Sequence, residues 1–400
     1  MHILEQALQK NPIVYVTRDR ERALGIPENT PGYYIISNKP GVAKLDTWQL
    51  LEQPETIGLM ASLPKASIVV FKNTSQIEAV CKKYNWRLLN PPAALSAKVE
   101  EKISQVEWLG KLKKYLPPHH IDTLKNIAWD ACPAQSKDGA EFILQFNRAH
   151  TGLGTTLVQS KEQLQALQEK FPNRPVRVTQ YINGPMFTNN NVVTRDTILV
   201  GNINYQITGL PPFTDQAFAT IGNEWTLPGT LLSARQKKQY GEIATAVGLQ
   251  LRASGWRGLF GIDAIKDTET GKLFLIEINA RQPASTTFES QLQQSYKLKT
   301  KSYQLTTFEA HLLALLDADL KDTQLIPVTD GSQIILRVQP TKNFDLRSQI
   351  LDLESSNFNV IQYDNTTPGS DLIRIQSQHG IMSDHNQFDD IGQEILRTLS

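Results

Sequence analysis

The stretch from residue 258 to 281 constrains the fold more than any other part of this chain. It reads Gly258-Leu-Phe-Gly-Ile-Asp-Ala-Ile-Lys, then a polar turn, then Leu273-Phe-Leu-Ile-Glu-Ile-Asn-Ala-Arg281. Both flanking runs are rich in β-branched and aromatic residues, and the turn between them carries Asp, Thr and Gly. Such a pattern predicts two strands joined as a β-hairpin.

Alternation places the polar side chains of this hairpin on one side. Successive side chains of a strand point to opposite faces, so Glu277, Asn279 and Arg281 share a face. If the loop covers Thr268 to Lys272, Asp263 lies opposite Glu277 on the same face. An otherwise apolar hairpin therefore presents two carboxylates, a carboxamide oxygen and a guanidinium together.

Two interpretations of this polar face are open. Buried carboxylates rarely lack a partner, and Mg²⁺ takes oxygen ligands, usually one or two carboxylates together with phosphate and water oxygens. The face then indicates a metal–phosphate site. The alternative is an amphipathic hairpin whose polar side is solvated, and spacing alone does not separate the two.

The bulk properties exclude several classes of protein. The chain has 400 residues, of which 40% are hydrophobic and 20% charged, enough for two to four units with ample core. A net charge of +1 argues against a nucleic-acid partner. The N-terminus is too polar for a signal peptide, and no apolar run is long enough to span a membrane. Cys81 and Cys132 form no CxxC pair, which fits a reducing, cytoplasmic location.

The first 90 residues alternate apolar strands with helical stretches, which predicts an α/β unit with an open, largely parallel sheet. The expected elements are strands at 13–17, 33–37, 67–71 and 86–89, and a helix at 75–84. Asn90-Pro-Pro-Ala then marks a boundary, and a helix is expected from Ala97 to Lys114.

The remainder predicts a compact mixed unit, a main sheet and a β-rich end. The compact unit has strands at 142–146 and 176–182, a tight turn at 151–156 and a helix at 161–170. The main sheet takes strands at 198–200 and 203–207, an ordered polar loop at 208–228, a helix at 234–254 and the hairpin. A helix at 307–318 and strands at 333–338 and 371–376 follow.

Gly261-Ile-Asp263 followed by Ile276-Glu-Ile-Asn-Ala-Arg281 resembles the C-terminal metal strand pair of the ATP-grasp superfamily. The resemblance implies an α/β (α+β) ATP-grasp fold with a Rossmann-like N-terminal domain and a β-rich C-terminal domain. It implies ATP and Mg²⁺ (or Mn²⁺) as cofactors, with Asp263, Glu277 and Asn279 as metal ligands. Arg281 then meets the phosphates or the substrate as the catalytic residue.

The resemblance also divides the chain into five parts. These are an α/β domain at 1–90, a connecting helix at 91–120, a lid subdomain at 121–182, a main subdomain with the metal site at 183–305, and a C-terminal α+β domain at 306–400.

A phosphate-binding loop is expected at Gly152-Leu153-Gly154, where backbone N–H groups can form an anion-binding nest. His150, Thr151 and Thr155 could add side-chain donors, and Arg148 is a further candidate. The family also has a lysine that precedes the lid, and Lys102 matches its position better than Lys98 does. The hinge segment Gln180-Tyr181-Ile182 would read the adenine.

The chain departs from the family at two nucleotide contacts. The strand that enters the phosphate loop commonly carries a phosphate-binding lysine, and Gln145 stands there. A carboxamide brings no charge, and charge-assisted hydrogen bonds are about twice as strong as neutral ones. The acidic hinge residue is also absent, with Gln180 in its place. Both departures put nucleotide affinity in question.

The function implied is an ATP-dependent carbon–nitrogen ligase that produces ADP. ATP would phosphorylate a carboxylate, and an amine or similar nucleophile would attack the acyl phosphate. The partners are then a small-molecule carboxylate and a nucleophile, with a homodimer left open and Ser285 and Thr286 as candidate acceptor contacts. The alternatives are a kinase or carboxylase variant of the fold, and a non-catalytic ATP-binding or sensor module.

Overall fold

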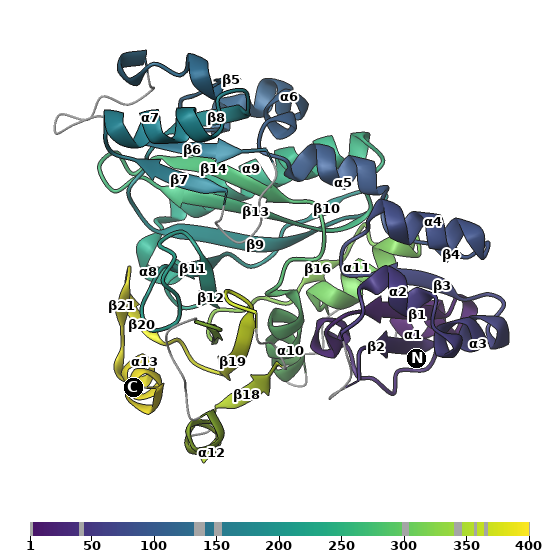
Figure 1. The fold of residues 1–400 in the computed structure, drawn as a ribbon. Helices are drawn as coiled ribbons and strands as arrows, with labels where there is room; N and C mark the ends of the chain where they lie inside the picture. Colours follow the sequence, from purple (N-terminus) through teal and green to yellow (C-terminus); the bar gives the residue numbers. More distant parts are fainter. Residues whose placement is uncertain are drawn as a thin grey trace.

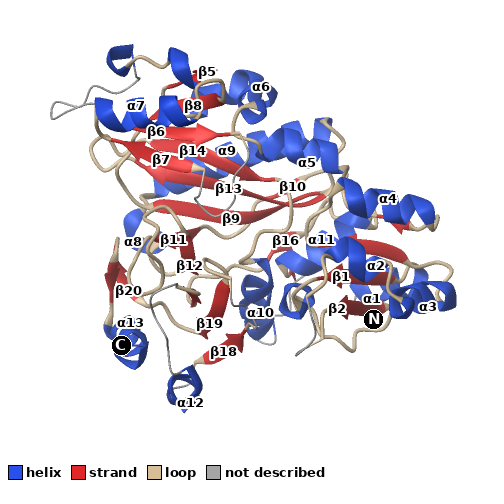
Figure 2. Cartoon of the chain, in the orientation of Figure 1, coloured by secondary structure: helices blue, strands red, loops and turns tan. Residues whose placement is uncertain are grey.

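The computed structural model describes residues 3–39, 44–131, 141–147, 154–297, 304–339, 346–355, 358–363 and 367–399. Three sheets dominate it, and Figures 1 and 2 show how helices surround them. None of the helices in these ranges is long and apolar enough to cross a membrane.

The N-terminal sheet is parallel, as the sequence predicts, and its strand order is β2-β1-β3-β4. Its strands are β1 (Ile13–Thr17), β2 (Tyr33–Ser37), β3 (Ser67–Val70) and β4 (Arg87–Leu88). Its helices are α1 (Ile3–Lys10), α2 (Thr47–Leu51), α3 (Pro54–Ser62) and α4 (Ser75–Lys83), with a 3₁₀ turn η1 (Arg20–Ala23). All residues of β1 and β3 are buried, which explains their unbroken apolar runs.

The prediction of a single helix at 97–114 is wrong. The chain forms α5 (Ala93–Glu100), then α6 (Ser104–Leu109) and the 3₁₀ helix η2 (Gly110–Tyr115). Glu101 has an extended backbone (ψ 131°), and the Ser104 hydroxyl donates to the carbonyl of Lys98 at 2.9 Å. Local side-chain bonds of this kind compete with helix continuation. The break places Lys102 in a loop between two helices.

A small antiparallel sheet follows, in the order β5-β8-β6-β7. Its strands are β5 (His119–Thr123), β6 (Phe142–Phe146), β7 (Thr155–Val158) and β8 (Pro175–Gln180). Helix α7 (Lys161–Lys170) and the 3₁₀ turns η3 (Leu124–Asn126) and η4 (Trp129–Ala131) complete this unit. Leu144, Val176 and Val178 form its own core. In Figure 1 this small sheet lies over the hairpin end of the large sheet.

The large sheet has nine strands, in the order β14-β13-β9-β11-β12-β17-β19-β18, with β10 paired to β9. Its bounds are β9 (Met186–Val193), β10 (Ile198–Leu199), β11 (Asn204–Thr208), β12 (Thr220–Glu224), β13 (Gly258–Lys266), β14 (Leu273–Asn279), β17 (Ser332–Arg337), β18 (Asn359–Gln362) and β19 (Asp371–Ser377). The prediction of a continuous loop at 208–228 is therefore partly wrong, since β12 lies within it and joins this sheet between β11 and β17. The five-part division remains a prediction.

Helix α9 (Ala234–Ala253) covers one face of this sheet. It begins with a capping box, in which Ser233 accepts from the Gln236 amide and Gln236 accepts from the Ser233 amide. Its buried residues recur at helical spacing: Tyr240, Ile243, Ala244, Val247, Gly248 and Leu251. A Cβ at Gly248 would lie 2.7 Å from Ile198, so glycine permits the close approach.

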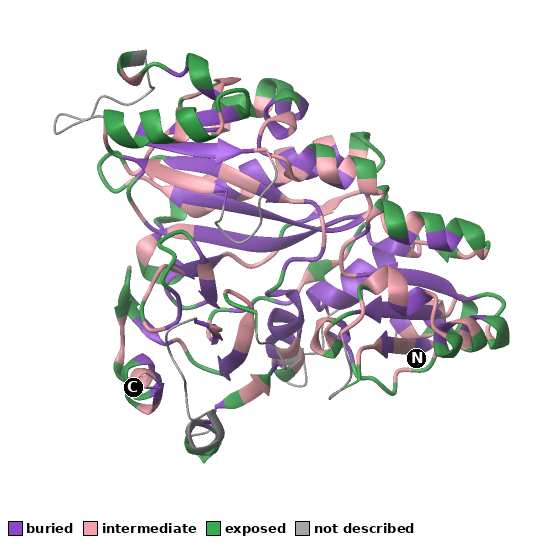
Figure 3. Cartoon of the chain, in the orientation of Figure 1, coloured by how far each residue is buried: buried purple, intermediate pink, exposed green. Residues whose placement is uncertain are grey.

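The remaining helices and short strands pack around the large sheet. They are α8 (Pro228–Leu231), α10 (Thr286–Lys297), α11 (Thr307–Leu315), α12 (Leu346–Ser355) and α13 (Asp390–Leu399), with β15 (Gln304–Leu305) paired to β16 (Gln324–Leu325) and β20 (Met382–Asp384) to β21 (Gln387–Phe388). Figure 3 shows that the central strands are mostly buried, whereas α7 turns an exposed side outward.

Candidate functional site

The hairpin brings Asp263 opposite Glu277, as the sequence predicts, and a β-bulge makes this possible. Lys266 pairs with Leu273, so the connection starts one residue earlier than expected. A regular ladder would then set Asp263 opposite Ile276. Instead the register shifts between Asp263 and Ala264, and Glu277 joins Ile276 on the cavity side while Leu275 packs in the main core.

The two carboxylates differ in their surroundings. Asp263 is 8% exposed, and its Oδ1 atom has no hydrogen-bond partner. Burial and the Glu277 charge raise the pKa of Asp263 to about 6. Burial also disfavours the Glu277 carboxylate, but the Lys102 ammonium, 2.7 Å from Glu277 Oε2, lowers its pKa overall. Glu277 is therefore ionised beside Lys102, whereas Asp263 is the carboxyl group that more readily takes up a proton or a cation.

A divalent cation fits this donor set. Asp263 lines the cavity and has a buried oxygen, Oδ1, without a hydrogen-bond partner. The Asn279 amide lies beside it, with Nδ2 3.2 Å from Asp263 Oδ2. Within the described ranges, no three His, Cys, Asp or Glu side chains gather as a metal centre. A cation here would be coordinated by two carboxylates, one amide oxygen and oxygens of the ligand, which is the usual coordination of Mg²⁺.

Arg281 reaches the same cavity from the end of β14 and pairs with Glu100 of α5. Glu100 also accepts from Lys72, whose Nζ lies 2.7 Å from Oε2. Burial opposes the Arg281 charge, but Glu100 and Glu277 raise its pKa overall. The guanidinium is therefore charged and held in place by the helix that precedes Lys102.

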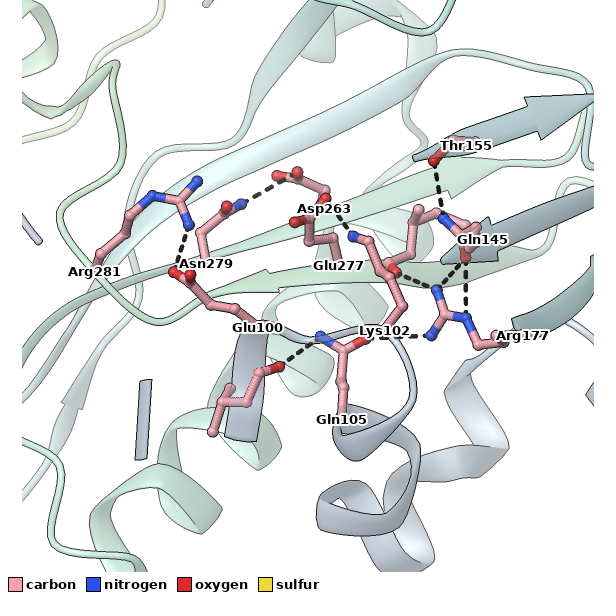
Figure 4. A network of polar contacts seen from close by, with 12 residues as sticks. Glu100, Lys102, Gln105, Gln145, Thr155, Arg177, Asp263, Glu277, Asn279 and Arg281 are labelled. Carbon is pink, nitrogen blue, oxygen red and sulfur yellow. Dashed lines mark hydrogen bonds and ion pairs between the residues drawn. The ribbon is translucent and has the colours of Figure 1, made fainter. Parts of the chain in front are cut away.

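These side chains line a central cavity of about 870 Å³ between the small sheet and the hairpin. Figure 4 shows Asp263, Glu277 and Asn279 pointing to one side, with Lys102 and Arg281 approaching from either end. A neighbouring cavity of about 990 Å³ adjoins the N-terminal sheet and the C-terminal strands. The two cavities share Arg22, Phe71, Lys72, Thr74, Arg337 and Asp371.

The predicted nucleotide contacts that the structure describes all line the central cavity. Lys102 reaches it from the break between α5 and α6, whereas Lys98 is exposed. Gln145 of β6 donates to the Thr155 hydroxyl of β7 at 3.3 Å. Gln180, Tyr181 and Ile182 follow at the end of β8, where the Gln180 amide donates to the Pro118 carbonyl at 3.0 Å.

Most of the predicted phosphate loop lies outside the described residues. This holds for Arg148, His150, Thr151, Gly152 and Leu153. Gly154 is described, and its carbonyl accepts from the Phe146 amide at 3.0 Å, which closes the β6–β7 pairing.

Three side chains of this site were not predicted from the sequence: Glu100, Gln105 and Arg177. Arg177 on β8 donates from Nε to Gln145 Oε1 at 2.9 Å and from Nη2 at 2.6 Å. Gln105 of α6 accepts from Arg177 Nη1 at 3.4 Å. A signal was available, because Arg177 interrupts an apolar strand between Val176 and Val178, whose side chains face the opposite way.

Several other polar residues divide between the cavity and the core. Gln206 and Ser285 line the central cavity. Asn189 and Asn191 bond to each other, at 2.7 Å in both directions, and are fully buried. The Tyr205 hydroxyl bonds His385 and Asn386 instead of facing the cavity, and Thr286 is buried.

The fold has clear relatives among solved structures. No protein-family model matches the sequence, and no curated protein matches it. N5-carboxyaminoimidazole synthase from Aspergillus clavatus, solved with ADP and 5-aminoimidazole ribonucleotide, has a TM-score of 0.66 at 15% identity, covering 98% of both chains. The Staphylococcus aureus synthetase, solved with ADP, has a TM-score of 0.64 at 14% identity, covering 98% of this chain and 100% of that one.

An L-amino acid ligase from Bacillus licheniformis has a TM-score of 0.62 at 13% identity and covers 97% of both chains. These proteins are ATP-grasp ligases, so the chain described here has the ATP-grasp fold along nearly its whole length. The resemblance that the hairpin suggests is thereby confirmed for the fold.

Proposed function

We propose that this chain, whose fold is that of the ATP-grasp ligases, uses ATP and Mg²⁺ to activate a carboxylate for attack by an amine or similar nucleophile. The observation that carries the proposal is the facing pair Asp263 and Glu277 beneath a cavity lined by Lys102 and Arg281. Structural relatives with the same arrangement of elements are ligases, and two were solved with ADP.

The residues take separate roles in this proposal. Asp263, Glu277 and Asn279 would hold Mg²⁺, which would supply positive charge that neutralises the charge developing on the phosphates during transfer. Lys102 would leave Glu277 and bind the phosphate chain. Gln180, Tyr181 and Ile182 would line the adenine site, and Gln145, Gly154 and Thr155 would lie over the phosphates. The small sheet would exclude water that hydrolyses the activated carboxylate.

The reaction needs no side-chain nucleophile. A carboxylate oxygen of the substrate attacks the γ-phosphorus, the bond from that phosphorus to the β-phosphate oxygen breaks, and ADP leaves. The amine then attacks the acyl carbon, phosphate leaves with the C–O bond pair, and the amine loses a proton. Arg281 would stabilise the negative charge on the transferring group and on the acyl phosphate.

The neighbouring cavity is the proposed place for the carboxylate and the nucleophile. It adjoins the central cavity, with which it shares lining residues that include Lys72 and Arg337. Ser285, which lines the central cavity, remains a candidate acceptor contact, whereas Thr286, which lines neither of the two cavities, is a weaker one. The A. clavatus relative holds 5-aminoimidazole ribonucleotide together with ADP, which makes a small-molecule acceptor a reasonable first choice. A cytoplasmic location is part of this proposal.

A non-catalytic ATP-binding module is the second candidate, and Gln145 favours it. The phosphate-binding lysine of the family is missing there, so nucleotide could be held without rapid transfer. A pure binding module has no need of two carboxylates brought face to face by a bulge, which favours the ligase.

The test is Mg²⁺-dependent ADP formation by the purified protein, with ATP and a pooled small-molecule extract, alongside calorimetry of ATP binding. Glu277→Gln removes a metal ligand, and we expect it to lower the rate at least about 100-fold. Glu269→Gln, an exposed glutamate in the turn of the same hairpin, is the matched control and should keep the rate.

Three outcomes separate the candidates. ADP formation that Glu277→Gln abolishes and Glu269→Gln preserves supports the ligase, and fractionation of the pool then identifies the acceptor. Tight ATP binding without ADP from any pool supports the binding module. A protein that binds no ATP contradicts both.

A further inference from the structure

Arg177 is a buried cation whose hydrogen bonds to described residues all go to uncharged oxygens. It is 2% exposed and lines the central cavity. Its hydrogen bonds run to Gln145 Oε1, to Gln105 Oε1 at 3.4 Å and to the Ile276 carbonyl at 3.4 Å. Burial lowers the pKa of Arg177 to about 10, which leaves the guanidinium charged at neutral pH.

No carboxylate of the described ranges forms an ion pair with Arg177. Glu277 is near enough to favour its charge, but the ammonium of Lys102 already occupies Glu277 Oε2. A buried charge without a counter-ion is costly, and a ligand that brings the opposite charge would offset this cost. The cavity that Arg177 lines is the one proposed for ATP, whose phosphates bring that charge.

The register of the small sheet sets Arg177 directly beside Gln145. The two residues are paired across β6 and β8, and Leu144, Val176 and Val178 point the other way, into the core of that sheet. Figure 4 shows the guanidinium next to the Gln145 carboxamide, on the same side as Lys102. A positive charge therefore stands one strand away from the position where the family resemblance leads one to expect a lysine.

We propose that Arg177 binds the phosphate chain of ATP in place of the lysine missing at position 145, with Gln145 holding the guanidinium in position. The proposal rests on the proposed function. The two bonds to Gln145 fix one edge of the planar fork, and the two 3.4 Å contacts are the ones that phosphate oxygens would replace.

A purely structural role is the alternative. Arg177 links β8 to α6 through Gln105 and to β14 through Ile276, so it could serve only to join the small sheet to the hairpin. The two roles differ in what they require. Phosphate binding requires a positive charge, which a lysine at position 145 on the neighbouring strand could also supply. A structural link requires the guanidinium of Arg177 itself.

The experiment is calorimetry of ATP, ADP and adenosine binding, each with Mg²⁺, to the wild-type protein and to variants whose melting temperatures are also measured. We expect Arg177→Met to weaken ATP and ADP binding about 30-fold or more and to change adenosine binding less than about twofold. Adding Gln145→Lys to Arg177→Met should recover at least about tenfold of the ATP affinity.

Arg174→Met is the matched control, because Arg174 is an exposed arginine directly before β8, with its guanidinium over the Phe146 ring. It should bind all three ligands as the wild type does. If Arg177→Met does not fold, Arg177→Gln replaces it, since an amide can still donate to Gln145 without bringing a charge.

Three results would overturn the assignment while leaving the proposed function intact. Arg177→Met could bind ATP as tightly as the wild type, it could lose adenosine binding to the same extent as ATP binding, or adding Gln145→Lys could fail to restore ATP affinity. A wild-type protein that binds neither ATP nor ADP would overturn the proposed function and this assignment with it. Selective loss of the phosphorylated ligands, followed by recovery, would support it.

Discussion

The Asp263 carboxyl makes metal binding depend on pH in a predictable direction. Its pKa is raised to about 6, so below that pH a cation has to displace a proton from it. We expect the Mg²⁺ affinity, measured by calorimetry, to be constant above pH 7 and to fall by up to about tenfold per pH unit below pH 6.

Asp263→Asn provides the comparison. It removes the titrating group, so its weaker Mg²⁺ affinity should vary less between pH 5 and 7 than that of the wild type. Equal pH profiles of the two proteins would mean that Asp263 does not contact the cation.

Individual residues of the site were predictable to different degrees. The face shared by Glu277, Asn279 and Arg281 follows from strand alternation alone, and Lys102 follows from the family resemblance. Arg177 and Glu100 did not follow, because their importance depends on which strand or helix lies beside them. Pairing of β6 with β8 is a long-range contact, and local periodicity carries no information about it.

Among the elements, helix α10 contains a buried acid, Glu289, that the proposed reaction does not use. Glu289 accepts from Asn190 of β9, from Asn202 at 3.1 Å and from the Thr307 hydroxyl at 2.8 Å. Burial raises the pKa of Glu289 to about 7, well above its value in an unfolded chain. The side chain joins α10 to the centre of the large sheet.

The sign of the resulting pH dependence follows from linkage. Between about pH 4.5 and 7 the folded state holds a proton on Glu289 that the unfolded state has lost, so the free energy of unfolding falls as pH rises. Relative to Glu289→Gln, the wild type should lose up to about 3 kcal/mol across this interval in urea unfolding. A constant difference between the two proteins would show that Glu289 ionises normally.

The elements themselves were largely predictable, and the exceptions have local causes. Strands such as β1, β2 and β6 have the predicted bounds, since apolar runs with turn residues at each end define them. The helix expected at 97–114 breaks at Glu101, and β12 forms within an expected loop. Sheet partners stabilise β12, and its sequence Thr220-Ile-Gly-Asn-Glu224 gives little sign of a strand by itself.

At the scale of the whole molecule, one buried pair joins the N-terminal sheet to the segment after the hairpin. The Tyr15 hydroxyl of β1 donates to Gln282 Oε1, and Gln282 Nε2 donates to the Arg22 carbonyl at 2.8 Å. The junction lies next to the residues that both cavities share. It sets the position of the neighbouring cavity relative to the hairpin.

Removing this hydroxyl should weaken the junction. Tyr15→Phe leaves a buried acceptor unsatisfied, so we expect the free energy of unfolding to fall by about 1–3 kcal/mol, measured in urea. Tyr34→Phe, in β2 of the same sheet, is the control and should change stability by less than about 0.5 kcal/mol. A Tyr15→Phe protein as stable as the wild type would contradict the role given to the pair.

The pairing of Gln145 with Arg177 across two strands has a consequence for how relatives of this chain are recognised. A profile that scores each alignment column separately penalises glutamine at the first position and gives no credit for arginine at the second. If the guanidinium does the lysine's task, the conserved property is the charge of the two positions taken together. Chains that carry this exchange then form a recognisable subgroup, found by asking for covariation between two columns 32 residues apart.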